Sequence, residues 1–193
     1  MSNEYSISEF IKTTYSLILT KIFYKGARLI RRPFYVRGRK SIHFGDGFTS
    51  GRECRFDLLA KGKSNLVIGE NCKIGDRVHI VCHGEIIIGD NCLLASNIFI
   101  SDTSHGSYGM NSEGPDMAPE KRKLIVNKVC IGSNVWIGEN VCIMPGVTIG
   151  DGCVVGANSV VTKNIPKNSV IAGVPAIILK AWDGNGWKKN ESY

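Results

Sequence analysis

Aliphatic residues return every six positions through the stretch IGSNVWIGENVCIMPGVTIGDGCVVGANSVV, residues 131–161. An α-helix repeats about every 3.6 residues and a strand every 2, so a strict period of six matches neither alone. Six is three strand periods, so a chain that turns every six residues keeps these side chains on the inner side of every turn. The pattern therefore predicts an all-β fold, a parallel β-helix of hexapeptide repeats. The repeat positions are Ile131, Ile137, Ile143, Ile149, Val155 and Val161.

The same period is present upstream, with one interruption. Ile68, Ile74 and Ile80 are six apart, the sequence CHGE at 82–85 shifts the phase by two residues, and the repeat resumes at Ile88. A sandwich of short strands would not hold so fixed a phase. Between residues 103 and 128 the period vanishes in favour of Gly, Ser, Pro and charged residues, which predicts a long excursion loop, and such loops in compact domains are usually functional.

The first segment predicts an amphipathic helix. Ser6 and Glu9 form a capping-box pattern. Lysines interrupt the segment too often for a membrane span. Two interpretations remain for this helix with its apolar stripe: the helix packs on the β-helix end or on a neighbouring subunit, or it lies on an anionic membrane surface. The stripe consists of Ile7, Phe10, Ile11, Tyr15, Ile18 and Ile22.

These patterns divide the chain into three parts. Residues 1–40 are a basic amphipathic helical segment, residues 41–165 a β-helix domain with the excursion loop at 103–128, and residues 166–193 a C-terminal cap and tail. The N-terminal part also carries the charge: residues 1–45 hold nine Lys or Arg and two Glu, which accounts for the whole net charge of +7. These basic residues are not interleaved with aromatic residues on a strand face, so nucleic acid is not an expected partner.

Composition narrows the class further. A chain of 193 residues with 43% hydrophobic and 21% charged residues is typical of one globular domain rather than of disorder. The seven cysteines form no CxxC motif, and Cys72, Cys92 and Cys153 occupy the position that valine holds in other repeats. They are expected to be small buried side chains in a reducing compartment. With no secretory signal pattern at the N-terminus, we expect a cytoplasmic protein, in contact with the inner face of the membrane if the helix binds lipid.

The residues also carry a family resemblance. The stretch from IGSNVWIG to GVPAIIL, residues 131–179, resembles hexapeptide-repeat acyltransferases and is similar to the galactoside and maltose O-acetyltransferases. GRKSIHFGDGFTSGRECRFD and ISDTSHGSY resemble the O-antigen and capsule O-acetyltransferases of that superfamily. The resemblance implies a left-handed parallel β-helix, a homotrimer, and acetyl-CoA bound as donor in the cleft between subunits. The hand comes from the family alone, because period six does not determine it.

The resemblance places the catalytic histidine of the family at His105, where the excursion loop begins. A sugar hydroxyl is a poor nucleophile at neutral pH, and an imidazole near its own pKa can remove the proton as the oxygen attacks. Asp102 is expected either to orient this imidazole or to cap the loop. Trp136 is a candidate donor to the tetrahedral oxyanion, as is a backbone N–H. For the other three histidines, His43, His79 and His83, the expectation is an ordinary hydrogen-bonded or exposed side chain.

The resemblance also implies the donor site. Trp136 matches the tryptophan that lines the pantetheine tunnel, and Ala157, Thr162 and Lys163 match positions that contact CoA. Lys163 and Lys180 would bind its phosphates. Two positions depart from the family: Ile177 follows GVPA where arginine is frequent, and Glu139 stands where the galactoside group has a small serine. No metal is expected to be required.

The predicted function is acetyl-CoA-dependent O-acetylation of a sugar in bacterial surface polysaccharide, with a sugar, sugar-nucleotide or lipid-linked glycan as acceptor. The sugar-binding asparagine and tyrosine of the galactoside group have no counterpart near residues 73–77, so galactoside and maltose are not expected. The alternatives are N-acetylation of an amino-sugar nucleotide, a zinc site of the carbonic-anhydrase type using His79, His83 and His105, and a non-enzymatic scaffold. The basic N-terminal segment would suit an anionic membrane or a pyrophosphate-linked carrier.

Overall fold

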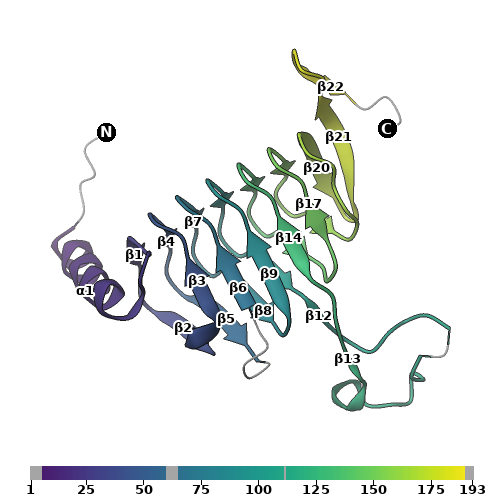
Figure 1. The fold of residues 1–193 in the computed structure, drawn as a ribbon, viewed down its shortest axis with the longest axis horizontal. Coiled ribbons are helices and arrows are strands. Elements are labelled where there is room, and N and C mark those ends of the chain that lie inside the picture. Colours follow the sequence, from purple (N-terminus) through teal and green to yellow (C-terminus); the bar gives the residue numbers. More distant parts are fainter. Residues whose placement is uncertain (1–5, 60–64, 111, 190–193) are drawn as a thin grey trace.

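The computed structural model describes residues 6–59, 65–110 and 112–189, and they form a parallel β-helix with one helix at its first coil (Figure 1). The all-β prediction is confirmed. Each coil passes through three parallel sheets in turn, here called sheets A, B and C. Sheet A consists of β1 (Leu29–Ile30), β4 (Thr49–Ser50), β7 (Lys73–Ile74), β10 (Leu93–Leu94), β15 (Trp136–Ile137), β18 (Val154–Val155) and β20 (Ser169–Gly173), then the antiparallel β21 (Ala176–Trp182) and β22 (Trp187–Lys189).

Sheets B and C complete the three sides of the coil. Sheet B consists of β2 (Phe34–Arg37), β5 (Cys54–Leu58), β8 (His79–Cys82), β11 (Phe99–Ser101), β16 (Cys142–Ile143) and β19 (Val160–Val161). Sheet C consists of β3 (Ile42–Phe44), β6 (Asn65–Ile68), β9 (Glu85–Ile88), β14 (Val129–Ile131) and β17 (Thr148–Ile149). A short 3-10 helix, η1 (Arg39–Ser41), joins β2 to β3.

The six-residue period sets which side chains are buried. Every repeat position named from the sequence lies in the core, exposed by 5% or less, because successive corners keep the same side-chain parity. Cys72, Cys92 and Cys153 are buried beside them, as predicted. The two-residue shift at 82–85 is absorbed by longer strands: β8 and β9 have four residues each, and both Ile86 and Ile88 point inward.

The corners explain the glycine and asparagine that follow the inward residues. A Cβ on Gly69 would lie 2.7 Å from the backbone carbon of Gly89 in the next coil, and one on Gly89 would lie equally close to Gly132. A side chain at either of these two positions would clash with the backbone of the next coil. Two residues later the chain turns through a left-handed residue, and Asn71 and Asn91 both have φ of 56° there.

The helix α1 (Ile7–Phe23) packs on the first coil through its polar face. Ser6 caps it, accepting a hydrogen bond from the Glu9 N–H at 3.3 Å. Its buried residues are Ser16 and Thr20, whereas the apolar stripe is exposed by 55–82%. The helix thus packs on the β-helix end, as one interpretation expected, but through its polar face and not through the apolar stripe. The exposed stripe is free to contact a neighbouring subunit or a membrane.

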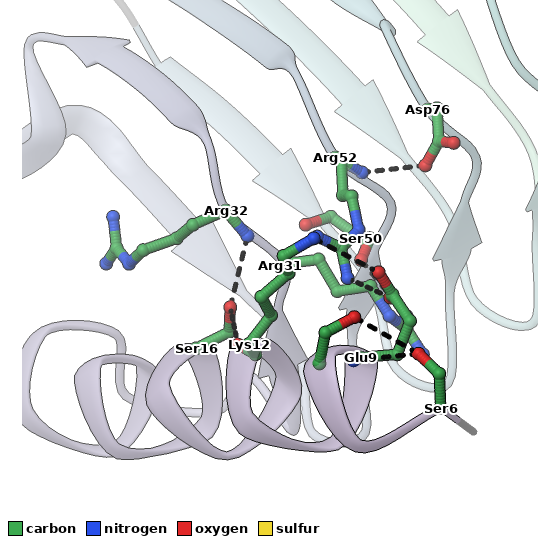
Figure 2. Close-up of polar contacts among 10 residues, drawn as sticks. Ser6, Glu9, Lys12, Ser16, Arg31, Arg32, Ser50, Arg52 and Asp76 are labelled. Atoms are coloured by element: carbon green, nitrogen blue, oxygen red, sulfur yellow. Dashed lines mark hydrogen bonds and ion pairs between the residues drawn. The ribbon is translucent and has the colours of Figure 1, made fainter.

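Hydrogen-bonding needs of the first coil explain this orientation. Strand β1 is the edge of sheet A, so its outward N–H groups lack a strand partner. Thr20 Oγ1 accepts a hydrogen bond from the Ile30 N–H at 2.9 Å. Ser16 Oγ accepts one from the Arg32 N–H at 3.2 Å (Figure 2). The small hydroxyls of α1 thus cover the sheet edge, and an apolar face could not do so.

An arm leaves the β-helix between β11 and β14. It contains the antiparallel pair β12 (Thr103–His105) and β13 (Leu124–Val126) and a 3-10 helix, η2 (Pro119–Lys121), and it projects away from the coils (Figure 1). Its base is closed by the Asn127 N–H donating to the Asp102 carbonyl at 2.8 Å. The excursion predicted over 103–128 therefore has strand structure of its own. In the described part of the chain no helix is long and apolar enough to cross a membrane.

Candidate active site

His105 lies at the outer end of β12, on the arm, with an exposed side chain. Its backbone pairs with Leu124 of β13, and the Tyr108 hydroxyl donates to its carbonyl at 3.1 Å. The next residue, Gly106, is buried at φ 90° and returns the chain toward Lys123. Among the described residues none hydrogen-bonds the imidazole, so both ring nitrogens can meet a bound substrate.

Asp102 lies at the base of the arm and is fully buried. Its carboxylate accepts hydrogen bonds from the Gly84 N–H at 2.7 Å, the His83 N–H at 2.9 Å and the Thr103 hydroxyl at 2.6 Å. These contacts hold the arm to the 83–84 turn of the preceding coil. No hydrogen bond joins Asp102 to His105 among the residues that the structure describes.

The residues predicted to bind CoA lie in two groups. Trp136 is half-exposed on the outer face of sheet A. Register places it in one row with Val154, Val170 and Lys180, so the tryptophan and that lysine share a face. Ala157 lies at the neighbouring corner, where its backbone nitrogen would be 2.6 Å from a Cβ on Gly138.

The second group lies at the corner between sheets B and C. Thr162 and Lys163 line a hollow of about 190 Å³ together with Pro175 and Ile177. This corner is also the one from which the arm leaves two coils earlier. A single chain therefore does not bring Trp136 and Lys163 into one pocket, and the hollow is smaller than the roughly 300–1,000 Å³ typical of ligand sites.

Sequence reasoning missed a charged cluster on the outer face of sheet B. The Asp57 carboxylate accepts hydrogen bonds from Arg55 Nε at 2.6 Å and lies 3.2 Å from His79 Nε2, with Arg37 Nε at 3.3 Å. Burial opposes ionisation of Asp57, but the hydrogen bonds from Arg55 and His79 and the nearby guanidinium charges outweigh it, so its pKa lies below the ordinary value. His79 was expected to be an ordinary histidine. The signal that could have found it is the register, because β2, β5 and β8 are neighbours in sheet B.

The zinc alternative finds no support within one chain. His79 is held by Asp57 in β5, whereas His105 is on the arm. Among the described residues no three His, Cys, Asp or Glu side chains are grouped closely enough to hold a metal ion.

Comparison with known proteins identifies the family. The bacterial transferase hexapeptide (six repeats) family matches residues 131–163, and the hexapeptide repeat of succinyl-transferase matches residues 65–102. The chain is 43% identical to WbbJ of Escherichia coli (strain K12), a protein provisionally assigned to lipopolysaccharide biosynthesis as an O-acetyl transferase. The match covers 95% of this chain and 93% of WbbJ. This chain belongs to the hexapeptide-repeat acyltransferases.

Solved structures of other hexapeptide-repeat acyltransferases have the same fold. A galactoside acetyltransferase in complex with coenzyme A is 29% identical with a TM-score of 0.56, over 93% of this chain and 74% of that one. AntD, an N-acyltransferase from Bacillus cereus in complex with coenzyme A and dTDP-4-amino-4,6-dideoxyglucose, has a TM-score of 0.70. It covers 85% of this chain and 87% of its own, but at 24% identity the likeness concerns the fold alone. The parallel coil is consistent with the left-handed form that the family resemblance implies.

Proposed function

We propose that this hexapeptide-repeat acyltransferase transfers an acetyl group from acetyl-CoA to a sugar hydroxyl during synthesis of a bacterial surface polysaccharide, such as O-antigen, capsule or exopolysaccharide. The observation that carries the proposal is the 43% identity to WbbJ along nearly the whole length of both proteins. The exposed histidine on the arm supports it, because acyl transfer to a hydroxyl needs a base that a substrate can reach.

His105 is the proposed general base. The imidazole removes the hydroxyl proton while the oxygen forms a bond to the thioester carbonyl carbon. The tetrahedral oxyanion accepts a hydrogen bond from the Trp136 indole or a backbone N–H, and it collapses as the carbon–sulfur bond breaks. The imidazolium then returns its proton to the CoA thiolate. A base of this kind contributes about 10²–10⁴-fold in rate.

Acetyl-CoA is proposed to bind between subunits of a homotrimer. Two features support this: the hollow beside Lys163 is too small for CoA in one chain, and Trp136 lies on a different side of the coil. A neighbouring subunit could bring such separated surfaces together. Lys163 and Lys180 would neutralise the nucleotide phosphates, and Ala157 and Thr162 would contact the pantetheine arm. Light scattering coupled to gel filtration tests the assembly, and a monomeric, active enzyme would contradict it.

The exposed face of α1 is proposed to rest on an anionic membrane at the cytoplasmic side. Its centre is formed by Ile7, Ile11, Ile18 and Ile22, which all point away from the β-helix. Positive charge favours lipid over a second copy of the same helix, because residues 1–45 carry seven net positive charges and two such segments would repel. Vesicles with and without anionic lipid test this. Ile18→Asp and Ile22→Asp should weaken binding to anionic vesicles, Leu179→Asp at the opposite end should not, and equal binding by all would contradict the proposal.

Acetyl-CoA turnover, followed as released free thiol, tests the enzyme. The panel of acceptors comprises sugars, sugar nucleotides, amino-sugar nucleotides and extracted surface polysaccharide. We expect acceptor-dependent release with a hydroxyl acceptor and a fall of about 10²–10⁴-fold in kcat for His105→Ala. His43→Ala is the matched control, since His43 is also exposed but lies on sheet C away from the arm. Stimulation by amino sugars alone would favour N-acetylation, and release that no acceptor stimulates would overturn the proposal.

A further inference from the structure

A cavity of about 690 Å³ opens around β2, the edge strand of sheet B, and reaches the outer face of β5. Three arginines line it: Arg32, Arg37 and Arg55. Tyr35, which is 58% exposed, lies on the same wall. The volume is within the range of small-molecule sites, and the wall combines these arginines with aromatic and aliphatic side chains.

Asp57 aligns two of these arginines without using their outer ends. Its buried carboxylate contacts the Nε atoms of both Arg55 and Arg37, at 2.6 and 3.3 Å. The side chains of Arg37 and Arg55 remain 67% and 49% exposed, so their terminal NH₂ groups face the solvent. A guanidinium held at Nε presents its other donors in a fixed fork, which is the arrangement that phosphate oxygens accept.

The third arginine has no anionic partner. Arg32 donates its backbone N–H to Ser16, but its side chain extends away from that contact (Figure 2). Its Nε is buried without a hydrogen-bond acceptor, and among the described residues no carboxylate pairs with its guanidinium. Two carboxylates line the cavity, Asp57 and Glu53, and Glu53 is already 3.9 Å from a fourth arginine, Arg77. The local charge is therefore positive, which favours an anionic ligand.

The cavity is also connected to the arm by strand register. Arg37, Asp57, Val81 and Ser101 form one row across β2, β5, β8 and β11, and Ser101 immediately precedes the arm. Three steps of about 4.8 Å between neighbouring strands separate Arg37 from Ser101, so the arm begins roughly 14 Å from Arg37. His79 and Phe99, whose ring centroids are 5.4 Å apart, cover the face between them.

We propose that this arginine cavity binds the pyrophosphate of the acceptor, so that the acceptor is a sugar linked through pyrophosphate to a nucleotide or to a lipid. The inference rests on the proposed function, since it names the acceptor class for the same enzyme. The sugar would extend along the face of sheet B toward the arm, a distance that a pyrophosphate with one or two sugar residues can span. Tyr35 is placed to stack on a ring attached to the pyrophosphate.

Calorimetric titration with inorganic pyrophosphate, without acetyl-CoA, tests the site independently of turnover. We expect binding that weakens at least tenfold in Arg32→Gln and in Arg37→Gln. Both variants should still fold, because Arg55 and His79 still contact the buried carboxylate of Asp57 when Arg32 or Arg37 is replaced. Lys40→Gln is the matched control: it removes one charge from the same segment, is exposed and does not line this cavity. Equal affinity in all four proteins, or no binding by wild type, would overturn the inference.

Kinetics then separate the two sources of the pyrophosphate. Two acceptors are compared: a uridine diphosphate sugar, and a polyprenyl-pyrophosphate-linked sugar in neutral detergent micelles. For the acceptor that the enzyme uses, we expect both arginine variants to raise the KM about tenfold or more and to change kcat little. If the enzyme turns over an acceptor with the same KM in wild type and in both arginine variants, the arginine site is refuted and the proposed acetyltransferase function is not. Pyrophosphate binding that depends on the arginines in a protein without any acetyl transfer would keep the site and refute the proposed function.

Discussion

The substitution Thr20→Val tests how α1 is held on the β-helix. Valine keeps the shape of threonine and removes only the hydroxyl, which donates to the Ser16 carbonyl at 2.7 Å and accepts from the Ile30 N–H at 2.9 Å. Thr20 and Ile30 are both fully buried, so water cannot replace the lost acceptor. A buried backbone N–H without a partner costs about 1–3 kcal/mol. We therefore expect the free energy of unfolding to fall by that amount.

The matched control is Ile18→Ala, two residues away on the exposed face of the same helix. Ile18 is 55% exposed, so its truncation should change the free energy of unfolding by about 0.5 kcal/mol or less. Had the apolar stripe been packed in the core, the same substitution would cost about 2–5 kcal/mol. If α1 docks through its polar face, Thr20→Val loses more stability than Ile18→Ala. If α1 docked through its apolar stripe, Ile18→Ala would lose more.

Urea unfolding, followed by far-UV circular dichroism at one fixed protein concentration, measures both variants. Each kcal/mol should also shift the Tm by roughly 2–4 °C for a chain of this size. Hydrogen exchange at the Ile30 amide adds a local measurement, because Thr20→Val should speed exchange there more than elsewhere in sheet A. A neutral Thr20→Val together with a strongly destabilising Ile18→Ala would refute the polar-face docking of α1.

Three further predictions follow from single contacts. Asp102→Asn should lower the free energy of unfolding by about 1–3 kcal/mol, because it weakens the buried hydrogen bonds at the arm base, and a stability equal to that of wild type would contradict this. The pKa of Asp57 is lower in the folded chain, so the stabilisation that its ionised carboxylate provides is complete above the unfolded pKa near 3.9 and is lost as the pH falls through the folded value. The difference in free energy of unfolding between wild type and Asp57→Asn should therefore shrink below about pH 4. A difference that does not change with pH would contradict this. Five of the seven thiols are buried, and only Cys130 and Cys142 are half-buried. A thiol reagent at pH 8 should therefore react in the folded protein only with Cys130 and Cys142, because a reagent cannot reach the buried thiols, and burial also raises the thiol pKa of Cys54 to about 11 and of Cys82 to about 12. Rapid labelling of all seven thiols would count against the core packing.

Much of the acyltransferase's architecture was predictable because one rule governs it. A corner every six residues preserves strand parity, so the sequence determines which side chains point inward before any coordinates are known. Ile137 and Val155 are buried for this reason, and Gly69 and Asn71 fall at corners for the same one. The position of His105 at the start of the excursion could also be predicted, since loss of the period marks where the chain leaves the coil.

Only the tertiary structure decided which face of α1 turns inward. Helical spacing shows that Ile11 and Ile18 share a face but not what that face contacts. The deciding factor is the free edge of β1, whose Ile30 N–H needs an acceptor, and that edge exists only after the first coil has formed. A hydroxyl meets this need and an isoleucine cannot, so the hydrogen-bond requirement overrode the apolar pattern.

Contacts between coils are likewise beyond the sequence. Asp102 meets the backbone at residues 83 and 84, and Asp57 meets His79, through neighbouring coils whose corners differ in length. Paired residues on neighbouring strands are 24 positions apart for Arg55 and His79 but 20 apart for His79 and Phe99. No single sequence spacing therefore predicts which residues of sheet B are paired. The repeat determined the coil, and the variable corners determined which charged side chains the coil brings together, because register between strands depends on every residue inserted between them.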